Sequence, residues 1–171
     1  MPKGVINDRG EKYYMIIDYL CDHIGYVDTV ARWIYDEFVS GIISGHSYED
    51  VLASVKRCNK QELPIRLVAL AEENCVGTVS IVINDLKCRD YTPWLAALYV
   101  DKEFRNQKIG ERLIDAVKDI CVASGYNEVY LRTEHASDYY RRLGWQYVET
   151  CEDIDDLIPD VFLYELDTLE S

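Results

Sequence analysis

The chain has 171 residues, of which 49% are hydrophobic and 29% charged, and its formal net charge is −13. This composition is that of a globular protein. The negative charge argues against a nucleic-acid-binding surface, which needs a basic face, and no apolar run approaches the roughly 20 residues of a membrane span. With no repeat or linker to divide it, the chain is expected to form a single domain over residues 1–171.

Cysteine usage indicates the cellular compartment, and the distribution of charge indicates where an anion site would lie. The six cysteines form no C-x-x-C pair and the N-terminus has no apolar signal core, so we expect a cytoplasmic protein with reduced thiols. The three histidines are too dispersed to argue for a metal site. Residues 151–171 hold eight acidic and no basic residues, whereas residues 102–150 hold eight of each. Any anion site is therefore expected in the second of these segments.

The first half of the chain is predicted to form a strand, two helices and a hairpin. Apolar residues spaced by three and four predict the first helix. Ser47, followed three residues later by Asp50, is close to a capping box that would begin the second helix. Alternating apolar residues predict the second arm of the hairpin. The expected ranges are 12–20 for the strand, 26–40 and 47–58 for the helices, and 65–71 and 76–84 for the hairpin.

The second half predicts strands that alternate with two helices. The stretch "WLAALYV" is apolar on both faces, which is typical of a central strand. Gly144 stands where a C-cap glycine would end the second of these helices. The expected strands are 94–100, 127–133, 145–151 and 160–166, and the expected helices are 109–125 and 136–144. This order predicts a mixed α/β (α+β) domain.

A charged turn joins the central strand to the helix that begins near Ile109. A helix N-terminus presents unpaired N–H groups and a partial positive charge, and the turn adds Arg105 and Lys108, so it can bind an anion. The P-loop and dinucleotide-binding patterns are absent, which argues against a nucleotide-triphosphate enzyme. A structural turn with solvated charges would carry the same residues, so the pattern alone leaves both interpretations open.

Two segments resemble the GNAT superfamily of acetyl-CoA-dependent N-acetyltransferases. The run Arg105–Gly110, "RNQKIG", is similar to the family's R/Q-x-x-G-x-G/A signature, with Lys108 in place of the first glycine. The segment "TEHASDYYRRLGW" is similar to the family's N-x-x-A-x-x-x-Y segment, with Tyr140 on its tyrosine and Thr133 where asparagine is common. The order of elements over residues 12–166 agrees as well.

The resemblance implies a single GNAT-like domain whose central, mixed, mostly antiparallel sheet is splayed around the cofactor and flanked by about four helices. It implies acetyl-CoA as co-substrate, no metal, a small-molecule or peptide amine as acceptor, and a monomer or homodimer. It assigns Tyr140 as the general acid, although on spacing alone this residue would be read as packing. The implied cofactor contacts are Leu98, Tyr99, Val100, Arg105, Asn106, Gln107, Lys108, Ile109, Gly110, Glu111 and Thr133. If Lys108 adopts a positive φ it is strained, and its amine would offer a direct phosphate contact instead.

Several points stay open at this stage. The general base is Glu37, Asp101, Glu134, His135 or a chain of water molecules. Trp33 and Trp94 either line an acceptor cleft or fill the core. The acceptor walls are expected from the first two helices, from residues 85–94 and from the acidic residues 151–160, which favour polyamines, aminoglycosides or lysine-rich peptides. The alternative function is a non-catalytic acyl-CoA-binding or sensing module with the same fold.

Overall fold

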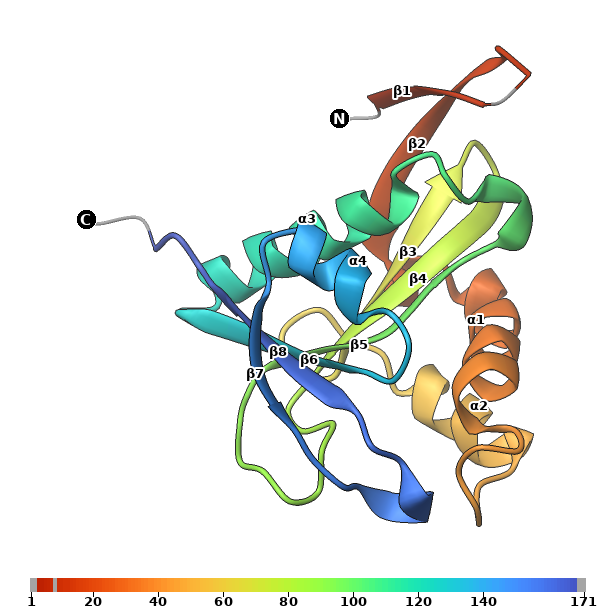
Figure 1. Cartoon of the computed structure of the whole chain (residues 1–171). Coiled ribbons are helices and arrows are strands. Elements are labelled where there is room, and N and C mark those ends of the chain that lie inside the picture. The colour runs from red at the N-terminus through yellow and green to blue at the C-terminus, as the bar shows by residue number, and fades with distance from the viewer. Residues whose placement is uncertain (1–2, 8, 169–171) are drawn as a thin grey trace.

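An eight-stranded sheet runs through the computed structural model, which describes residues 3–7 and 9–168 (Figure 1). Its order is β1-β2-β3-β4-β5-β6-β8-β7, and all neighbours are antiparallel except β5 and β6, which are parallel. This confirms the predicted mixed, mostly antiparallel sheet. The strands are β1 (Lys3–Ile6), β2 (Lys12–Tyr19), β3 (Ile65–Ala71), β4 (Asn74–Val82), β5 (Trp94–Val100), β6 (Glu128–Thr133), β7 (Gln146–Thr150) and β8 (Asp160–Glu165).

Two pairs of α-helices cover the sheet, one pair on each face (Figure 1). They are α1 (Val27–Ile34), which continues as a π-helical turn over Tyr35–Val39, α2 (Tyr48–Lys56), α3 (Ile109–Ala123) and α4 (Ser137–Arg142). The predicted capping box at α2 is confirmed, because Ser47 Oγ accepts the Asp50 N–H at 3.2 Å and the Asp50 carboxylate accepts the Ser47 N–H at 2.8 Å. Gly144 follows α4 with φ 89°, as expected of a C-cap glycine.

A strand that the sequence did not predict precedes the one expected at residues 12–20. β1 pairs antiparallel with β2, and the two project together from the rest of the molecule (Figure 1). Only part of this short edge strand is covered, since Val5 is half-buried and Ile6 is 66% exposed. So brief a stretch, with a glycine at its centre, lacks the alternating apolar pattern by which a strand is recognised.

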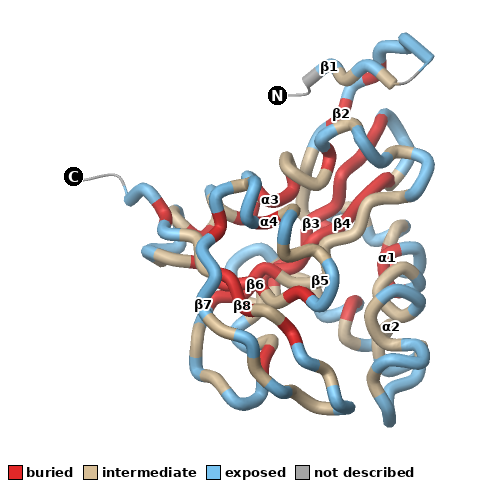
Figure 2. Tube along the Cα trace, viewed as in Figure 1, coloured by how far each residue is buried: buried red, intermediate tan, exposed pale blue. Residues whose placement is uncertain are grey.

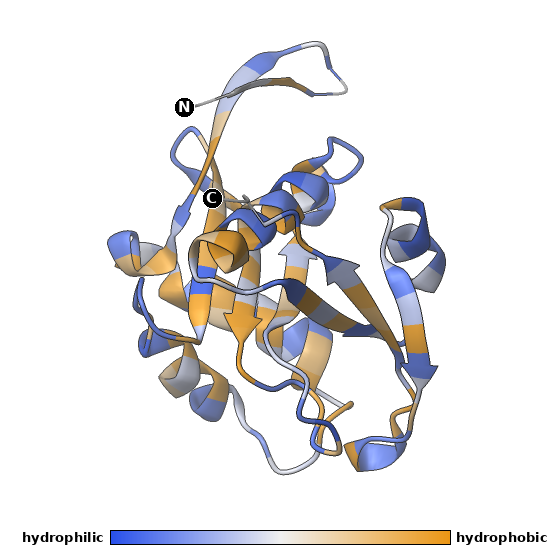
Figure 3. Ribbon diagram, turned by 90° about the vertical axis from the view of Figure 1, so that its left-hand side faces the viewer, coloured by the Kyte–Doolittle hydropathy of each residue, from blue (hydrophilic) through white to orange (hydrophobic). Residues whose placement is uncertain are grey.

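β3 lies between two layers of core, which explains why all seven of its residues are buried. Leu67 and Ala69 pack beneath α3, while Val68 and Leu70 face α1 and α2. Figure 2 shows buried residues concentrated along β3, β4 and the inner side of α3, and Figure 3 shows hydrophobic strands between helices whose outer sides are hydrophilic. Burial of apolar surface on both faces of the central strands holds the helix layers in place.

β5 is paired along its length on one side only. Its pairing with β4 extends from Trp94 to Val100, whereas its parallel pairing with β6 is limited to Trp94 and Tyr130. A β-bulge in β5, where Ala97 adopts φ 52°, marks the bend. Beyond Trp94 the two strands separate, and the edge of β5 that faces β6 keeps unpaired backbone groups. The predicted splayed sheet is confirmed.

The close contact between α3 and β4 gives a first prediction. A Cβ on Gly77 would lie 3.1 Å from the Tyr99 carbonyl oxygen and 3.1 Å from Leu113 Cδ1. Because one of these atoms is backbone, Gly77→Ala should lower the free energy of unfolding by about 1–3 kcal/mol in urea titrations. Gly25→Ala is the matched control, since a Cβ there meets no atom within 4 Å. Equal stability of the two variants would contradict the close packing.

Candidate functional site

The turn between β5 and α3 contains two residues in the left-handed conformation. Asn106 has φ 64° and Lys108 has φ 62°. Asparagine tolerates this region, but a lysine there is strained by its Cβ, at a cost of roughly 1–2 kcal/mol. Lys108 therefore adopts the strained conformation that the sequence raised as a possibility. Such strain persists where the surrounding structure fixes the backbone, and it concentrates at binding sites.

The N-terminus of α3 has no cap of its own. Lys108 is the N-cap residue and makes no side-chain capping bond, and the first main-chain bond of the helix runs from the Arg112 N–H to the Lys108 oxygen at 3.1 Å. The N–H groups of Ile109, Gly110 and Glu111 make no hydrogen bond to any described residue. α2, by contrast, has a capping box at its N-terminus, formed by Ser47 and Asp50. The α3 terminus thus offers free donors and the positive end of a 15-residue helix.

Arg105 lies over the end of β5. Its Nε donates to the Val100 oxygen at 3.0 Å, and its guanidinium lies 5.3 Å from the centre of the Tyr99 ring. Lys108, three residues further, is exposed at the helix start. Two cations therefore lie beside the free N–H groups, at the end of β5 that is separated from β6.

Gln107 fixes the turn to β2. Its Oε1 accepts a hydrogen bond from the Tyr13 hydroxyl, and the Tyr13 ring packs edge-to-face on Phe104 with centroids 6.3 Å apart. Arg112, one turn into α3, donates to the Met15 oxygen at 3.3 Å. The side chain of Gln107 therefore holds the backbone of the turn in place. Sequence reasoning missed the role of Tyr13, because a strand residue some ninety positions away carries no local signal.

Tyr140 of α4 lies in the main core. It is only 8% exposed, and its ring packs on Trp145 at 6.1 Å and Phe162 at 6.4 Å. Its hydroxyl makes no hydrogen bond to any described residue, and burial raises the pKa of Tyr140 well above its ordinary value. The phenol therefore keeps its proton throughout the neutral range, as a proton donor must.

Tyr139, the neighbour of Tyr140, points toward the start of α3. Its hydroxyl oxygen lies 3.3 Å from the place that a Cβ on Gly110 would occupy, with Val100 Cγ2 at 3.8 Å. Burial raises the pKa of Tyr139 as well. A side chain at position 110 would therefore contact Tyr139, and the structure brings Val100, Gly110 and Tyr139 together at the turn.

The other predicted site residues divide between β5 and the end of β6. Leu98, Tyr99 and Val100 are half-buried beyond the point where β5 leaves β6. Thr133 is 8% exposed, and its hydroxyl oxygen accepts the Ala136 N–H at 3.0 Å, which closes the turn into α4. Among the described residues, the Thr133 side chain makes no hydrogen bond to the 105–110 turn.

The two tryptophans that the sequence left open have different environments. Trp94 is fully buried and stacks with Tyr91, so it fills core. Trp33 of α1 is half-buried and packs on Tyr99, with ring centroids 5.2 Å apart. Trp33 therefore covers the face of β5 beside the separated strands instead of filling core.

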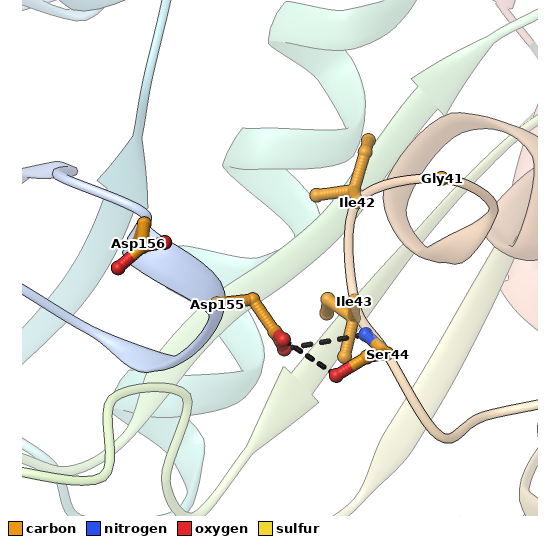
Figure 4. Close-up of a pocket in the computed structure, with 6 residues that line it drawn as sticks. All are labelled: Gly41, Ile42, Ile43, Ser44, Asp155 and Asp156. Carbon is orange, nitrogen blue, oxygen red and sulfur yellow. Dashed lines mark hydrogen bonds between the residues drawn. The ribbon is translucent and has the colours of Figure 1, made fainter.

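On the α1 side, a pocket of about 440 Å³ lies between two connections that are distant in sequence (Figure 4). The α1–α2 connection contributes residues 41–44, and the β7–β8 connection contributes Asp155 and Asp156. Asp155 joins them, because its carboxylate accepts from Ser44 Oγ at 2.5 Å and from the Ser44 N–H at 3.3 Å. Two of the segments expected to form acceptor walls are thus adjacent.

The general-base candidates differ in their contacts. The Glu134 carboxylate is bound by Arg132 at 2.7 Å, and Asp101 accepts the Glu103 N–H at 3.1 Å. Glu37 and His135 are exposed. Sequence reasoning did not single out Arg132, which also donates to Asp153 and, at 3.2 Å, to the Asp85 main-chain oxygen. That cluster joins a strand to two loops, so no local pattern reveals it.

None of the helices formed by residues 3–7 and 9–168 is long and apolar enough to cross a membrane. Over the same residues, no group of three or more His, Cys, Asp and Glu side chains has an arrangement that would hold a metal ion.

Comparison with known proteins decides the family. Residues 27–145 match the model of the Acetyltransferase (GNAT) family. The chain belongs to the GNAT acetyltransferase family. The resemblance seen in the 105–110 turn and in the Tyr140 segment is thereby confirmed, and this GNAT protein is an acyltransferase. None of the curated proteins matches the sequence.

Solved structures superpose on nearly all of this GNAT protein. An aminoglycoside 6'-N-acetyltransferase complexed with coenzyme A gives a TM-score of 0.71 at 16% identity, over 91% of this chain and 99% of that one. The aminoglycoside 6'-N-acetyltransferase of Enterococcus faecium gives 0.68 at 15% identity, over 91% and 99%. A putative acetyltransferase of Salmonella typhimurium with its cofactor acetyl-CoA gives 0.68 at 14% identity, over 92% and 96%. At such identities the likeness concerns the fold.

The start of α3 yields a paired prediction. Gly110→Asp should weaken coenzyme A binding at least tenfold in calorimetry, because it adds a negative charge at the free N–H groups and a side chain against Tyr139. Lys108→Gly should raise the free energy of unfolding by up to about 1 kcal/mol, since glycine adopts the left-handed conformation without strain.

Binding should survive in Lys108→Gly with at most a moderate loss from the missing charge. Unchanged affinity in Gly110→Asp would mean that the phosphates bind elsewhere. Abolished binding in Lys108→Gly would mean that the lysine amine is an essential ligand.

Proposed function

We propose that this GNAT protein transfers the acetyl group of acetyl-CoA directly to a primary amine of a small molecule or peptide. The observation that carries the proposal is the uncapped N-terminus of α3, with Arg105 and Lys108 beside it, at the point where β5 has left β6. Free N–H groups, a helix dipole and two cations suit a pyrophosphate. The adjacent unpaired edge of β5 suits an extended arm that carries amide groups.

Each predicted residue has a proposed task. The N–H groups of Ile109, Gly110 and Glu111 bind phosphate oxygens, with Arg105 and Lys108 adding charge, while Asn106 and Gln107 shape the turn. Leu98, Tyr99 and Val100 offer their backbone to the arm, and an N–H of this strand polarises the thioester carbonyl. Thr133 keeps its hydroxyl hydrogen free to donate, since its oxygen already accepts from Ala136.

Tyr140 is the proposed proton donor to the leaving sulfur. Its hydroxyl has no protein partner among the described residues and its raised pKa keeps it protonated. A phenol of raised pKa is a weak acid in the resting protein. A thiolate that forms in the same apolar surroundings is itself destabilised, which makes it a stronger proton acceptor.

The proposed acceptor is a cationic amine that enters from the α1 side. The pocket lined by Asp155 and Asp156, together with the acidic residues 151–171, supports this choice, because carboxylates attract ammonium groups. The aminoglycoside acetyltransferases among the similar structures agree with a small-molecule acceptor. A non-catalytic acyl-CoA sensor would need the same anion site but no acidic acceptor pocket, so the enzyme is the better-supported alternative.

Thiol release from acetyl-CoA with a panel of amines tests the proposal. Polyamines and aminoglycosides should give lower KM values than neutral amino acids, and these KM values should rise with ionic strength. Asp156→Asn should raise the KM for a polyamine with little change in kcat, whereas Asp119→Asn on the exposed side of α3 should change neither. Absence of amine-dependent thiol release, together with no thermal stabilisation by millimolar coenzyme A, would refute the proposal.

A Tyr140 variant tests the proton donor. Tyr140→Phe removes the hydroxyl and leaves the ring contacts with Trp145 and Phe162, so the unfolding midpoint and coenzyme A affinity should hardly change. The kcat should fall by about two orders of magnitude, the usual contribution of one general acid. Tyr139→Phe is the control and should cost far less. An unchanged kcat in Tyr140→Phe would mean that water donates the proton, and equal losses in both variants would indicate a packing role.

A further inference from the structure

Arg132 of β6 lies at the centre of a cluster of three carboxylates from separate parts of the chain. Its Nη2 donates to Glu134 at 2.7 Å, its Nη1 donates to the Asp153 carboxylate, and the same Nη1 lies 3.2 Å from the Asp85 main-chain oxygen. The side chains of Arg132 and Asp153 are only 12% and 5% exposed. The β4–β5 loop, β6 and the β7–β8 connection thus meet at one guanidinium.

The guanidinium leaves one of the three carboxylates without a partner. Glu134 and Asp153 each hold a hydrogen bond from Arg132, whereas the half-buried Asp85 carboxylate makes none with any described residue. With all groups ionised the cluster carries a net charge of −2, and of its members Arg132 and Asp153 are largely buried. Such a cluster is relieved by binding a proton or an ammonium ion.

The cluster lies on the face of the sheet opposite α3, from which the proposed acceptor enters. Arg132 follows Tyr130 by two residues and so shares its face of β6, and Tyr130 packs on Trp94 and on Leu86, the neighbour of Asp85. Leu131, between them, faces the opposite core beneath α3. Asp85 therefore lies near the point where β6 parts from β5, on the same side as α1 and the acidic pocket.

We propose that Asp85 is the general base that takes a proton from the ammonium group of the acceptor. This inference rests on the proposed acetyl transfer. The ammonium gives one proton to the Asp85 carboxylate and becomes a neutral amine. As the C–N bond forms and the C–S bond breaks, the Tyr140 hydroxyl protonates the sulfur, and the nitrogen loses a second proton that restores the phenol. The proton on Asp85 then passes to solvent, which completes the balance.

The charges around Asp85 suit this role. Burial raises the pKa of Asp85 to about 7, the nearby Glu134 and Asp153 carboxylates add to the rise, and Arg132 opposes it. A base with a pKa near the working pH transfers protons well, and an amine of pKa about 10.4 is nearer to it than to an ordinary carboxyl group at about 3.9. Glu134 is less suited, since Arg132 holds its carboxylate.

The pH dependence of kcat/KM for a polyamine tests the inference. The wild type should show a limb that rises with pH through about 7, as Asp85 loses its proton. Asp85→Asn should abolish this limb and lower kcat/KM about a hundredfold. Asp85→Glu should recover part of the lost kcat/KM. Glu134→Gln should keep the limb but move it to lower pH, because a neighbouring negative charge is gone. Asp115→Asn, exposed on α3, should match the wild type.

A second readout does not depend on turnover. Since the folded-state pKa of Asp85 lies above the ordinary value of 3.8, ionising this group costs stability as the pH rises from about 4 to about 7. The melting temperature of Asp85→Asn relative to wild type should therefore be higher at pH 8 than at pH 5. Three results would each overturn the inference. The first is a well-folded, active Asp85→Asn that keeps the pH limb, and the second is a difference in melting temperature between Asp85→Asn and wild type that does not change with pH. The third is loss of the limb in Glu134→Gln. A wild type that releases no thiol with any amine would overturn the proposed function, and this inference with it.

Discussion

The incomplete pairing of β5 with β6 is the constraint on which the rest of the site depends. A central strand normally satisfies its backbone on both edges, and an unpaired buried N–H or carbonyl is costly. Here β4 holds β5 to its end, while β6 contacts it only at Trp94 and Tyr130. The free edge needs water or a ligand as partner. α3 packs on β4, where Leu113 lies close to Gly77, and so supports the strand to which β5 is paired.

The separated strands also divide the charges of the site. Arg105, Lys108 and the start of α3 lie at the C-terminal end of β5. The acidic cluster at Arg132 and the pocket with Asp155 lie on the α1 side. A protein with a formal net charge of −13 thus keeps a local positive site for an anion and a negative approach for a cation. Because the two proposed substrates carry opposite charge, this division would favour binding of both without competition.

The sequence predicted those features that have local physical causes. The basic turn before α3, the capping box at Ser47 and the central position of "WLAALYV" follow from residues that are close together in the chain. What it could not predict depends on tertiary packing. β1 is recognised as a strand only through its pairing with β2. The bulge at Ala97 and the meeting of Asp85 with Arg132 and Asp153 arise from how strands and loops fit together, which no periodicity encodes.

Two groups with raised pKa values would serve opposite ends of the proposed reaction. Burial in apolar core keeps the Tyr140 phenol protonated, so it can supply a proton to sulfur at any neutral pH. Burial beside two other carboxylates raises the pKa of Asp85 only to about 7, so this carboxylate can gain and lose a proton at neutral pH. Loss of hydration favours the protonated form of both groups. It keeps the phenol protonated as a proton donor, and it makes the carboxylate a stronger proton acceptor. Placing them on opposite faces of the separated strands would let one proton leave the amine while another reaches the thiolate.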